Sequence, residues 1–294
     1  MDIVIDNIRF VLDPKYAQIH SELPSIYRQF STTVDYREAS GCVYIGFQTF
    51  EISDLKNITP IFDDGSHLKI FNYQNSYFIK TDAPIFKNTV NGAKVSRDFS
   101  QAFLFCNMTT IQQAANTIFS FIYYPLIRIL FKHLIVRQEG CLFHASLVDI
   151  GGKGYVFTGH SGVGKSTISR LFVEKNIGRL LNDEIIGIKT HQNQYSAFGT
   201  PWTGESRIAV NDSVSLKGIF FLSHGSDNQI AEIRPKDALK RLLSLAAIPW
   251  YDKPSVTAAL DFLGKLVVDI PMYDLRFKPD ASVVDYFVHN MRRH

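Results

Sequence analysis

The sequence predicts an α/β protein in which a β-rich N-terminal region precedes a domain of alternating strands and helices. The region before residue 109 is rich in aromatic and β-branched residues, in short runs separated by turn residues. Helical and strand-like runs alternate from there on, and a glycine-rich loop joins an apolar strand to an amphipathic helix. These observations place the two regions at 1–108 and 109–294.

The composition is that of an ordinary globular protein. Of 294 residues, 46% are hydrophobic and 20% are charged, so the chain can bury a sizeable core. A formal net charge of +3 gives no electrostatic case for binding nucleic acid or an anionic membrane, and we expect neither partner. The three cysteines, Cys42, Cys106 and Cys141, lack CxxC spacing. They indicate reduced thiols in a cytoplasmic protein rather than disulfides or a zinc site.

The N-terminal region is expected to be mainly antiparallel and to carry no chemical motif. Its strands are predicted at 2–11, 42–52 and 67–79. Turn residues at 63–65 and 75–76 break these runs. The N-terminus has no basic segment followed by an apolar core, which predicts no signal peptide.

A helical pattern follows, with Thr109 or Thr110 as its expected N-cap. Its most apolar part, 118–136, is long enough to cross a membrane. However, Arg128 lies inside it and Pro125 interrupts it. We therefore expect a buried or amphipathic helix rather than a membrane span.

In the second region, the spacing of apolar residues alternates between the strand pattern and the helix pattern. Strands are expected at 141–150, 155–158, 185–189, 218–222 and 275–277, and helices at 168–175, 236–247, 255–266 and 281–291. Glycines at 151–154 predict a tight turn between the first two strands.

The loop after the strand at 155–158 fits the Walker A pattern G-x-x-x-x-G-K-[ST]. Glycines let successive backbone N–H groups surround a polyphosphate, and the helix N-terminus adds positive potential. Lys165 is expected to reach the β- and γ-phosphates, and the Ser166 hydroxyl to bind Mg²⁺. The flanking strand and helix favour this over a chance glycine-rich turn. The predicted nucleotide-binding residues in the loop are Gly159, His160, Ser161, Gly162, Val163, Gly164, Lys165, Ser166 and Thr167.

Two adjacent acids, Asp183 and Glu184, end an apolar segment shortly after this loop. Such a pair can divide two tasks, because one carboxylate can hold Mg²⁺ while the other accepts a proton from an attacking hydroxyl. Ser166, Asp183 and Glu184 are thus the predicted metal ligands, with Asp183 the stronger candidate of the two acids. The alternative is a solvated turn with two surface acids. His144 precedes the loop, and alone it is more typical of a core or surface histidine.

The segments FHASLVDIGGKGYVFTGHSGVGKST and LLNDEIIGI resemble the catalytic core of the HPr kinase/phosphorylase family. They also resemble, more distantly, the phosphoenolpyruvate carboxykinases of the same P-loop fold. The resemblance implies that Asp183 deprotonates the acceptor serine and that His144 assists near the transferring phosphate. Glu184 stands where the family usually has Asp, and it is still expected to bind Mg²⁺. Because HPr kinases form hexamers, the resemblance also implies a homo-oligomer.

The chain departs from that family downstream. The second glycine-containing signature of the family is absent, and GTPWTGE (199–205) stands in its place. This segment resembles one in HPr kinase-related proteins with varied acceptors. Trp202 is a candidate stacking surface, Glu205 a candidate acceptor ligand and Arg207 a candidate phosphate clamp. The alternative is a turn between strands with Trp202 packing beneath it. A second tryptophan, Trp250, is expected to pack in the core or between domains.

We therefore expect a Mg²⁺-dependent kinase that transfers the γ-phosphate of ATP to a hydroxyl, on a protein serine or a small alcohol. The predicted catalytic residues are Asp183, His144 and Lys165, and Arg207 joins the nucleotide-binding set. Three alternatives stay open: an NTP hydrolase, a nucleotide-sensing regulator, and a carboxykinase-type lyase. The lyase would need a further metal site and a carboxylate-binding arginine that the sequence does not reveal.

Overall fold

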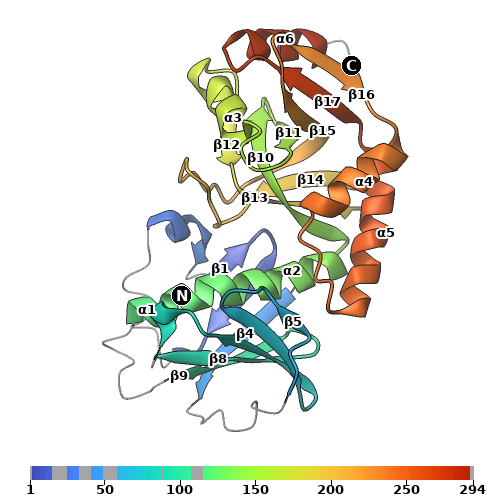
Figure 1. The fold of residues 1–294 in the computed structure, drawn as a ribbon. Coiled ribbons are helices and arrows are strands. Elements are labelled where there is room, and N and C mark those ends of the chain that lie inside the picture. The colour runs from blue at the N-terminus through green and yellow to red at the C-terminus, as the bar shows by residue number, and fades with distance from the viewer. Residues whose placement is uncertain are drawn as a thin grey trace. The chain divides into compact units, whose positions relative to one another are not determined.

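The computed structural model describes residues 2–14, 25–32, 41–48, 58–87, 89–106 and 115–291. The chain divides into two compact units, Met1–Leu134 and Ile135–His294 (Figure 1). The expected boundary at 108/109 and the expected N-cap at Thr109 or Thr110 lie outside the described residues. The division after Leu134 assigns most of the apolar helical stretch to the N-terminal unit.

The N-terminal unit is built on a nine-stranded sheet of order β3-β1-β2-β4-β9-β8-β7-β6-β5. Its strands are β1 (Asp2–Ile5), β2 (Ile8–Leu12), β3 (Ser31–Thr32), β4 (Gly41–Gln48), β5 (Phe62–Asp63), β6 (Leu68–Tyr73), β7 (Ser76–Thr81), β8 (Val90–Ser96) and β9 (Gln101–Cys106). Most pairs are antiparallel, as expected, but β4 runs parallel to both β2 and β9. The single strand expected at 2–11 is a hairpin, because Asp6, at φ 54°, turns the chain between β1 and β2.

The apolar stretch forms α1 (Ala115–Phe121), η5 (Ile122–Ile127) and α2 (Arg128–Arg137). Among the described residues, only Ala115–Arg137 is long and apolar enough to cross a membrane, and 67% of its most apolar window is buried. Phe121 and Phe131 meet rings from the N-terminal unit, and His133 stacks on Phe99 with centroids 4.0 Å apart. The stretch is thus a core element, as its internal charge indicated, and these contacts explain why it belongs to the N-terminal unit.

The C-terminal unit holds an eight-stranded sheet of order β11-β10-β13-β14-β15-β17-β16, with β12 also on β10. Because β11 also pairs with β15 in parallel, the pairings of β10, β11, β13, β14 and β15 form a closed circuit. The strands are β10 (Gly140–Ile150), β11 (Lys153–Thr158), β12 (Arg179–Asn182), β13 (Ile185–His191), β14 (Gln194–Gly199), β15 (Ser213–His224), β16 (Gln229–Glu232) and β17 (Met272–Phe277). The helices are α3 (Lys165–Glu174), α4 (Pro235–Leu245), α5 (Lys253–Asp269) and α6 (Ser282–Met291).

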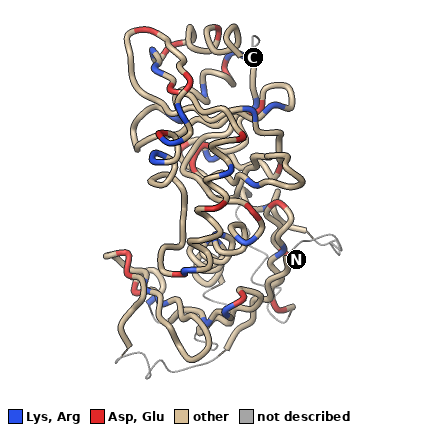
Figure 2. Tube along the Cα trace, turned by 90° about the vertical axis from the view of Figure 1, so that its right-hand side faces the viewer, with Lys and Arg blue, Asp and Glu red and all other residues tan. Residues whose placement is uncertain are grey.

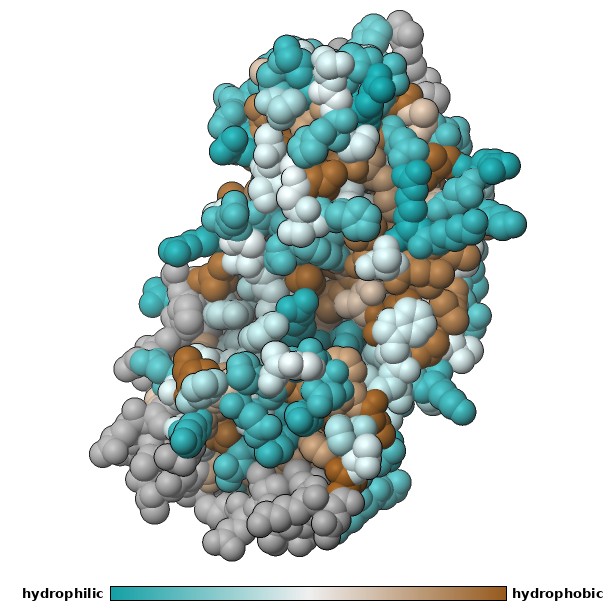
Figure 3. Space-filling model, in the orientation of Figure 1, coloured by the Kyte–Doolittle hydropathy of each residue, from teal (hydrophilic) through white to brown (hydrophobic). Residues whose placement is uncertain are grey.

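The surface carries mixed charge and one apolar helix face. Basic and acidic positions are interspersed along both units, in keeping with the small net charge of +3 (Figure 2). Hydrophobic side chains gather over α5 on the face drawn in Figure 3. Leu260 and Val268 of this helix are 41% and 71% exposed.

Trp250 was expected in the core or between domains, and the core position is wrong, because the residue is 60% exposed. It lies in the turn before α5, in which Ile248 and Pro249 take the buried positions. Asp252 ends that turn as the N-cap of α5, and its side chain accepts a hydrogen bond from the Ser255 backbone N–H at 3.0 Å. Trp250 is thereby left on the outer side of the turn.

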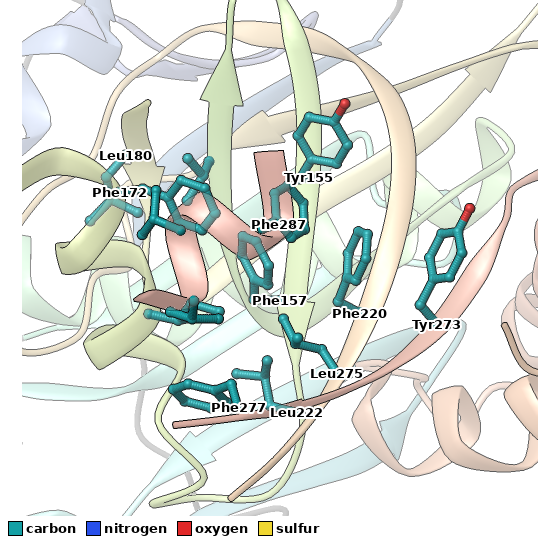
Figure 4. Packing of buried hydrophobic residues seen from close by; sticks show 14 residues of the cluster. Tyr155, Phe157, Phe172, Leu180, Phe220, Leu222, Tyr273, Leu275, Phe277 and Phe287 are labelled. Atoms are coloured by element: carbon teal, nitrogen blue, oxygen red, sulfur yellow. The ribbon is translucent and has the colours of Figure 1, made fainter. Parts of the chain in front are cut away.

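An aromatic core fixes α3 and α6 to the C-terminal sheet (Figure 4). Phe157 of β11 lies with its ring centroid 5.5 Å from those of both Phe172 of α3 and Phe287 of α6. All three side chains are fully buried. Such aromatic contacts stabilise beyond the area that they bury. The cluster therefore fixes the start of α3 relative to the end of β11, which sets the geometry of the loop between them.

Replacing Arg179 with glutamine is expected to lower stability at neutral pH by about 0.5–1 kcal/mol, because its ion pairs are partly exposed. Arg179 donates to Asp149 at 3.1 Å and to Asp212 at 2.6 Å. The bond to Arg179 holds the pKa of Asp212 below its ordinary value of 3.8. The stability that this ion pair contributes is fully present above pH 3.8 and is lost as the pH falls through the lowered pKa of Asp212.

Urea unfolding of wild type and Arg179→Gln at neutral pH and below pH 3.8 tests this. The difference in stability should shrink in acid. Arg170→Gln, which removes an exposed i,i+4 pair with Glu174, is the control and should cost less. A stability difference between wild type and Arg179→Gln that stays constant with pH would contradict the link between this ion pair and the ionisation of Asp212.

Candidate functional site

Strand register brings three segments of the predicted site to one place. In the sheet, Ala145 of β10 faces Thr158 at the end of β11, and His144 faces Ile185 at the start of β13. The Thr158 hydroxyl also donates to the His144 carbonyl at 2.9 Å. The glycine-rich loop after Thr158 and the acidic pair before Ile185 therefore lie on either side of His144.

The loop after β11 uses backbone conformations that suit glycine. Gly159, Gly162 and Gly164 have φ angles of 149°, 78° and 99°, which side-chain-bearing residues rarely adopt. Gly164 is the N-cap of α3. Within the described residues, the backbone N–H groups of Gly164, Lys165 and Ser166 donate no hydrogen bond. They form an open helix N-terminus, which is a favourable site for an anion.

Lys165 is folded back onto this loop. Its side chain donates to the carbonyl oxygens of Gly159 at 3.2 Å and of His160 at 3.3 Å, and the residue is 7% exposed. Burial lowers the pKa of the Lys165 ammonium, and the negative charge of Glu184 opposes that shift. The Lys165 ammonium therefore interacts electrostatically with Glu184 as well as with the loop carbonyls.

The two acids have different surroundings. Asp183 is 1% exposed, and its carboxylate accepts hydrogen bonds from the backbone N–H groups of Gly204 and Ser206, both at 3.1 Å. The side chain of Glu184 is 42% exposed, and its Oε2 lies 3.3 Å from Nε2 of His144. Asp183 thus fastens the loop that follows β14, whereas Glu184 is the solvent-facing carboxylate of the pair.

The GTPWTGE segment lies against the acidic pair. Trp202 is 6% exposed, which identifies it as a packing residue and not as an open stacking surface. Glu205, at the end of the segment, and Arg207, two residues beyond it, are exposed, and Arg207 adopts a φ of 54°. A Cβ atom at Gly204 would lie 3.2 Å from Oε2 of Glu184, so a glycine permits the close approach.

Two residues near the site escaped the sequence analysis. Asn182 is fully buried and directly precedes the acidic pair. Its side chain hydrogen-bonds to the backbone of Glu184 and to the carbonyl oxygen of Thr200. Nε2 of His224, at the end of β15, lies 3.3 Å from the carbonyl oxygen of Gly162 in the glycine-rich loop. The position of Asn182 beside the acids was a usable signal. His224 had none, because only the parallel pairing of β11 with β15 brings it to the loop.

Replacing Gly164 with alanine is expected to weaken nucleotide binding and to lower stability by about 1–3 kcal/mol through backbone strain. The added Cβ would also lie 2.8 Å from Cζ of Phe277, so either the Phe277 ring or the start of α3 must shift. Gly151→Ala is the matched control, because its φ is also positive and its Cβ meets nothing within 4 Å. Thermal unfolding and binding of a fluorescent ATP analogue check both variants. Equal losses in the two would show that the contact with Phe277 has no effect.

The chain has a mixed α/β architecture of large sheets, and its sequence is distantly related to that of an HPr kinase/phosphorylase. The chain belongs to the ScmC family: the family model described as SynChlorMet cassette protein ScmC matches residues 104–281.

A curated relative and a solved structure carry HPr kinase names. HPr kinase/phosphorylase of Prosthecochloris aestuarii (strain DSM 271 / SK 413) is 24% identical over 147 residues, which are 48% of this chain and 40% of that protein. The chain thus spans less than half the length of this relative. The structure of the Hpr(Ser) kinase/phosphatase from Coxiella burnetii is 15% identical and aligns over 51% of this chain and 95% of its own, with a TM-score of 0.33.

Proposed function

We propose that this protein is a Mg²⁺-dependent phosphotransferase that moves the γ-phosphate of ATP to a hydroxyl group, on a protein serine or a small alcohol. One observation carries the proposal. The open N-terminus of α3, the Lys165 ammonium and the Glu184–His144 pair meet where β11 ends and β13 begins. The distant relationship to an HPr kinase/phosphorylase supports the same class of reaction.

The glycine-rich loop is proposed to bind the nucleotide phosphates. Its backbone N–H groups and the start of α3 would face them, and Lys165 would exchange its two loop carbonyls for phosphate oxygens. Arg207, exposed at the tip of its loop, would approach the transferring phosphate or a charged acceptor. Preorganised cations stabilise the charge that spreads over the phosphoryl oxygens during transfer.

The residues present fit a magnesium ion that is shared with a nucleotide. The described residues contain no group of three His, Cys, Asp or Glu side chains that would hold a metal by themselves. Mg²⁺ in phosphate-transfer sites takes one or two protein carboxylates and completes its shell with phosphate and water oxygens. Ser166, Asp183 and Glu184 would supply the protein ligands. When bound, the ion neutralises charge on the phosphates.

Asp183 is proposed to accept the proton of the acceptor hydroxyl, with His144 assisting near the transferring phosphate. Because Asp183 is 1% exposed beneath Gly204 and Ser206, an acceptor reaches it only when that part of the loop moves. The proposal therefore couples acceptor binding to the GTPWTGE segment. The cytoplasmic location stays a prediction from the sequence, and the homo-oligomer stays a prediction from the resemblance to HPr kinases.

The test is incubation of the protein with ATP labelled on the γ-phosphate, Mg²⁺ and a host-type cell extract. Label in a discrete protein or metabolite supports the kinase and identifies its acceptor. Label found only as free phosphate would replace the proposal with an NTP hydrolase. Nucleotide binding without any turnover would replace it with a nucleotide sensor.

A further inference from the structure

Asn182 is a fully buried amide whose hydrogen-bonding groups are all used. Its Nδ2 donates to the carbonyl oxygens of Thr200 at 2.8 Å and of Trp202 at 3.1 Å. Its Oδ1 accepts from the backbone N–H groups of Glu184 at 2.7 Å and of Ile185 at 3.0 Å. One side chain thus joins the corner that carries the acidic pair to the first half of the GTPWTGE segment.

Other hydrogen bonds at that corner fix the Asp183 side chain, which accepts from the backbone N–H groups of Gly204 and Ser206. Asp183 and Glu184 lie between the end of β12 and the start of β13, outside both strands. The backbone of Glu184 is otherwise fixed by its carbonyl, which accepts from Ala145 at 3.1 Å. On the loop side, the Thr200 hydroxyl donates to the carbonyl of Ile185 at 2.6 Å. The position of the Glu184 backbone therefore depends on the Asn182 carboxamide.

We propose that Asn182 is a positioning residue that sets the acidic pair for Mg²⁺ and the nucleotide, and that holds the base of the GTPWTGE segment while its tip moves. The inference rests on the proposed function. The amide suits the task because it offers two donors to one segment and an acceptor to the other. Aspartate keeps the acceptor half but cannot donate, so its charge would face the carbonyls of Thr200 and Trp202.

The test measures binding of a fluorescent ATP analogue by the full chain, with Mg²⁺ and with a chelator instead. Binding without Mg²⁺ reports on the glycine-rich loop, and the increase that Mg²⁺ causes reports on the acidic pair. Partners behind metal ligands are worth about 10–100-fold in metal affinity. Asn182→Asp is therefore expected to lose about tenfold of the Mg²⁺-dependent increase while the Mg²⁺-free affinity stays that of the wild type.

Two further variants separate positioning from folding. Gly204→Ala perturbs the acids from the loop side, because its Cβ would lie 3.2 Å from Oε2 of Glu184 and 3.3 Å from both carboxylate oxygens of Asp183. It should reproduce the loss even if Asn182→Asp fails to fold. Tyr195→Phe removes a hydrogen bond to Asp269 at the other end of β14, and should bind like the wild type.

The outcomes distinguish this inference from the proposed function. A folded Asn182→Asp that keeps the wild-type Mg²⁺ increase would overturn the positioning role, as would a loss of the same size in Tyr195→Phe. Failure of Asn182→Asp to fold together with wild-type binding by Gly204→Ala would also overturn it. Wild-type protein that binds no nucleotide with or without Mg²⁺ would instead refute the proposed function itself.

Discussion

Lys165→Ala is expected to lower phosphoryl transfer by about 10²–10³-fold, the usual effect of removing one preorganised charge-stabilising donor. The reason is its place at the start of α3, where its ammonium is poised between the loop carbonyls and Glu184. Label transfer from γ-labelled ATP, in the presence of Mg²⁺ and the extract, measures the change.

The fold should survive this substitution. Burial lowers the pKa of the Lys165 ammonium, which means that the folded protein disfavours its charge, and alanine removes that cost. We therefore expect an unfolding temperature no lower than that of the wild type. Lys153→Ala, at the exposed start of β11, is the control and should transfer label normally. Near-normal transfer by Lys165→Ala would refute the assignment of the loop.

Asp183→Asn is expected to lower transfer by about 10²–10⁴-fold, the range that a positioned general base contributes. Its amide nitrogen cannot accept the bond that one carboxylate oxygen receives from Gly204 or Ser206. The variant therefore loses both the proton acceptor and one hydrogen bond to the loop after β14. Loss of a hydrogen bond to a buried charged group should also lower stability by about 1.5–3 kcal/mol.

Two measurements separate these effects. Label transfer reports the catalytic loss, and urea unfolding reports the structural one. Asp285→Asn, which removes a surface pair with Lys175, controls for loss of a carboxylate from the same unit and should transfer label normally. Wild-type transfer by Asp183→Asn would show that another group accepts the proton.

Local patterns were enough to predict the framework of the site. The strand before the glycine-rich loop and the helix after it correspond to β11 and α3, because apolar periodicity and the glycines specify both without distant contacts. The same holds for β10, β13 and the C-terminal helices. The hairpin of β1 and β2 was missed because its turn uses Asp6 at a positive φ, a conformation for which glycine is the usual sequence signal.

The arrangement around that framework depends on contacts between residues far apart in the sequence. The sequence predicted two adjacent carboxylates and favoured Asp183, but only the structure shows that the loop after β14 buries Asp183 and leaves Glu184 beside His144. The assignment of the apolar helix to the N-terminal unit likewise required its ring contacts.

The sequence by itself determined the chemistry available to this protein: a glycine-rich loop with Lys165 and Ser166, followed by an acidic pair. Those features are local, since they depend on residue type and short spacing. Only the tertiary structure decided which carboxylate faces solvent, that Asn182 joins the acids to the GTPWTGE segment, and that His224 reaches the loop. Strand pairing and burial between distant segments set those relations, and no short pattern encodes them.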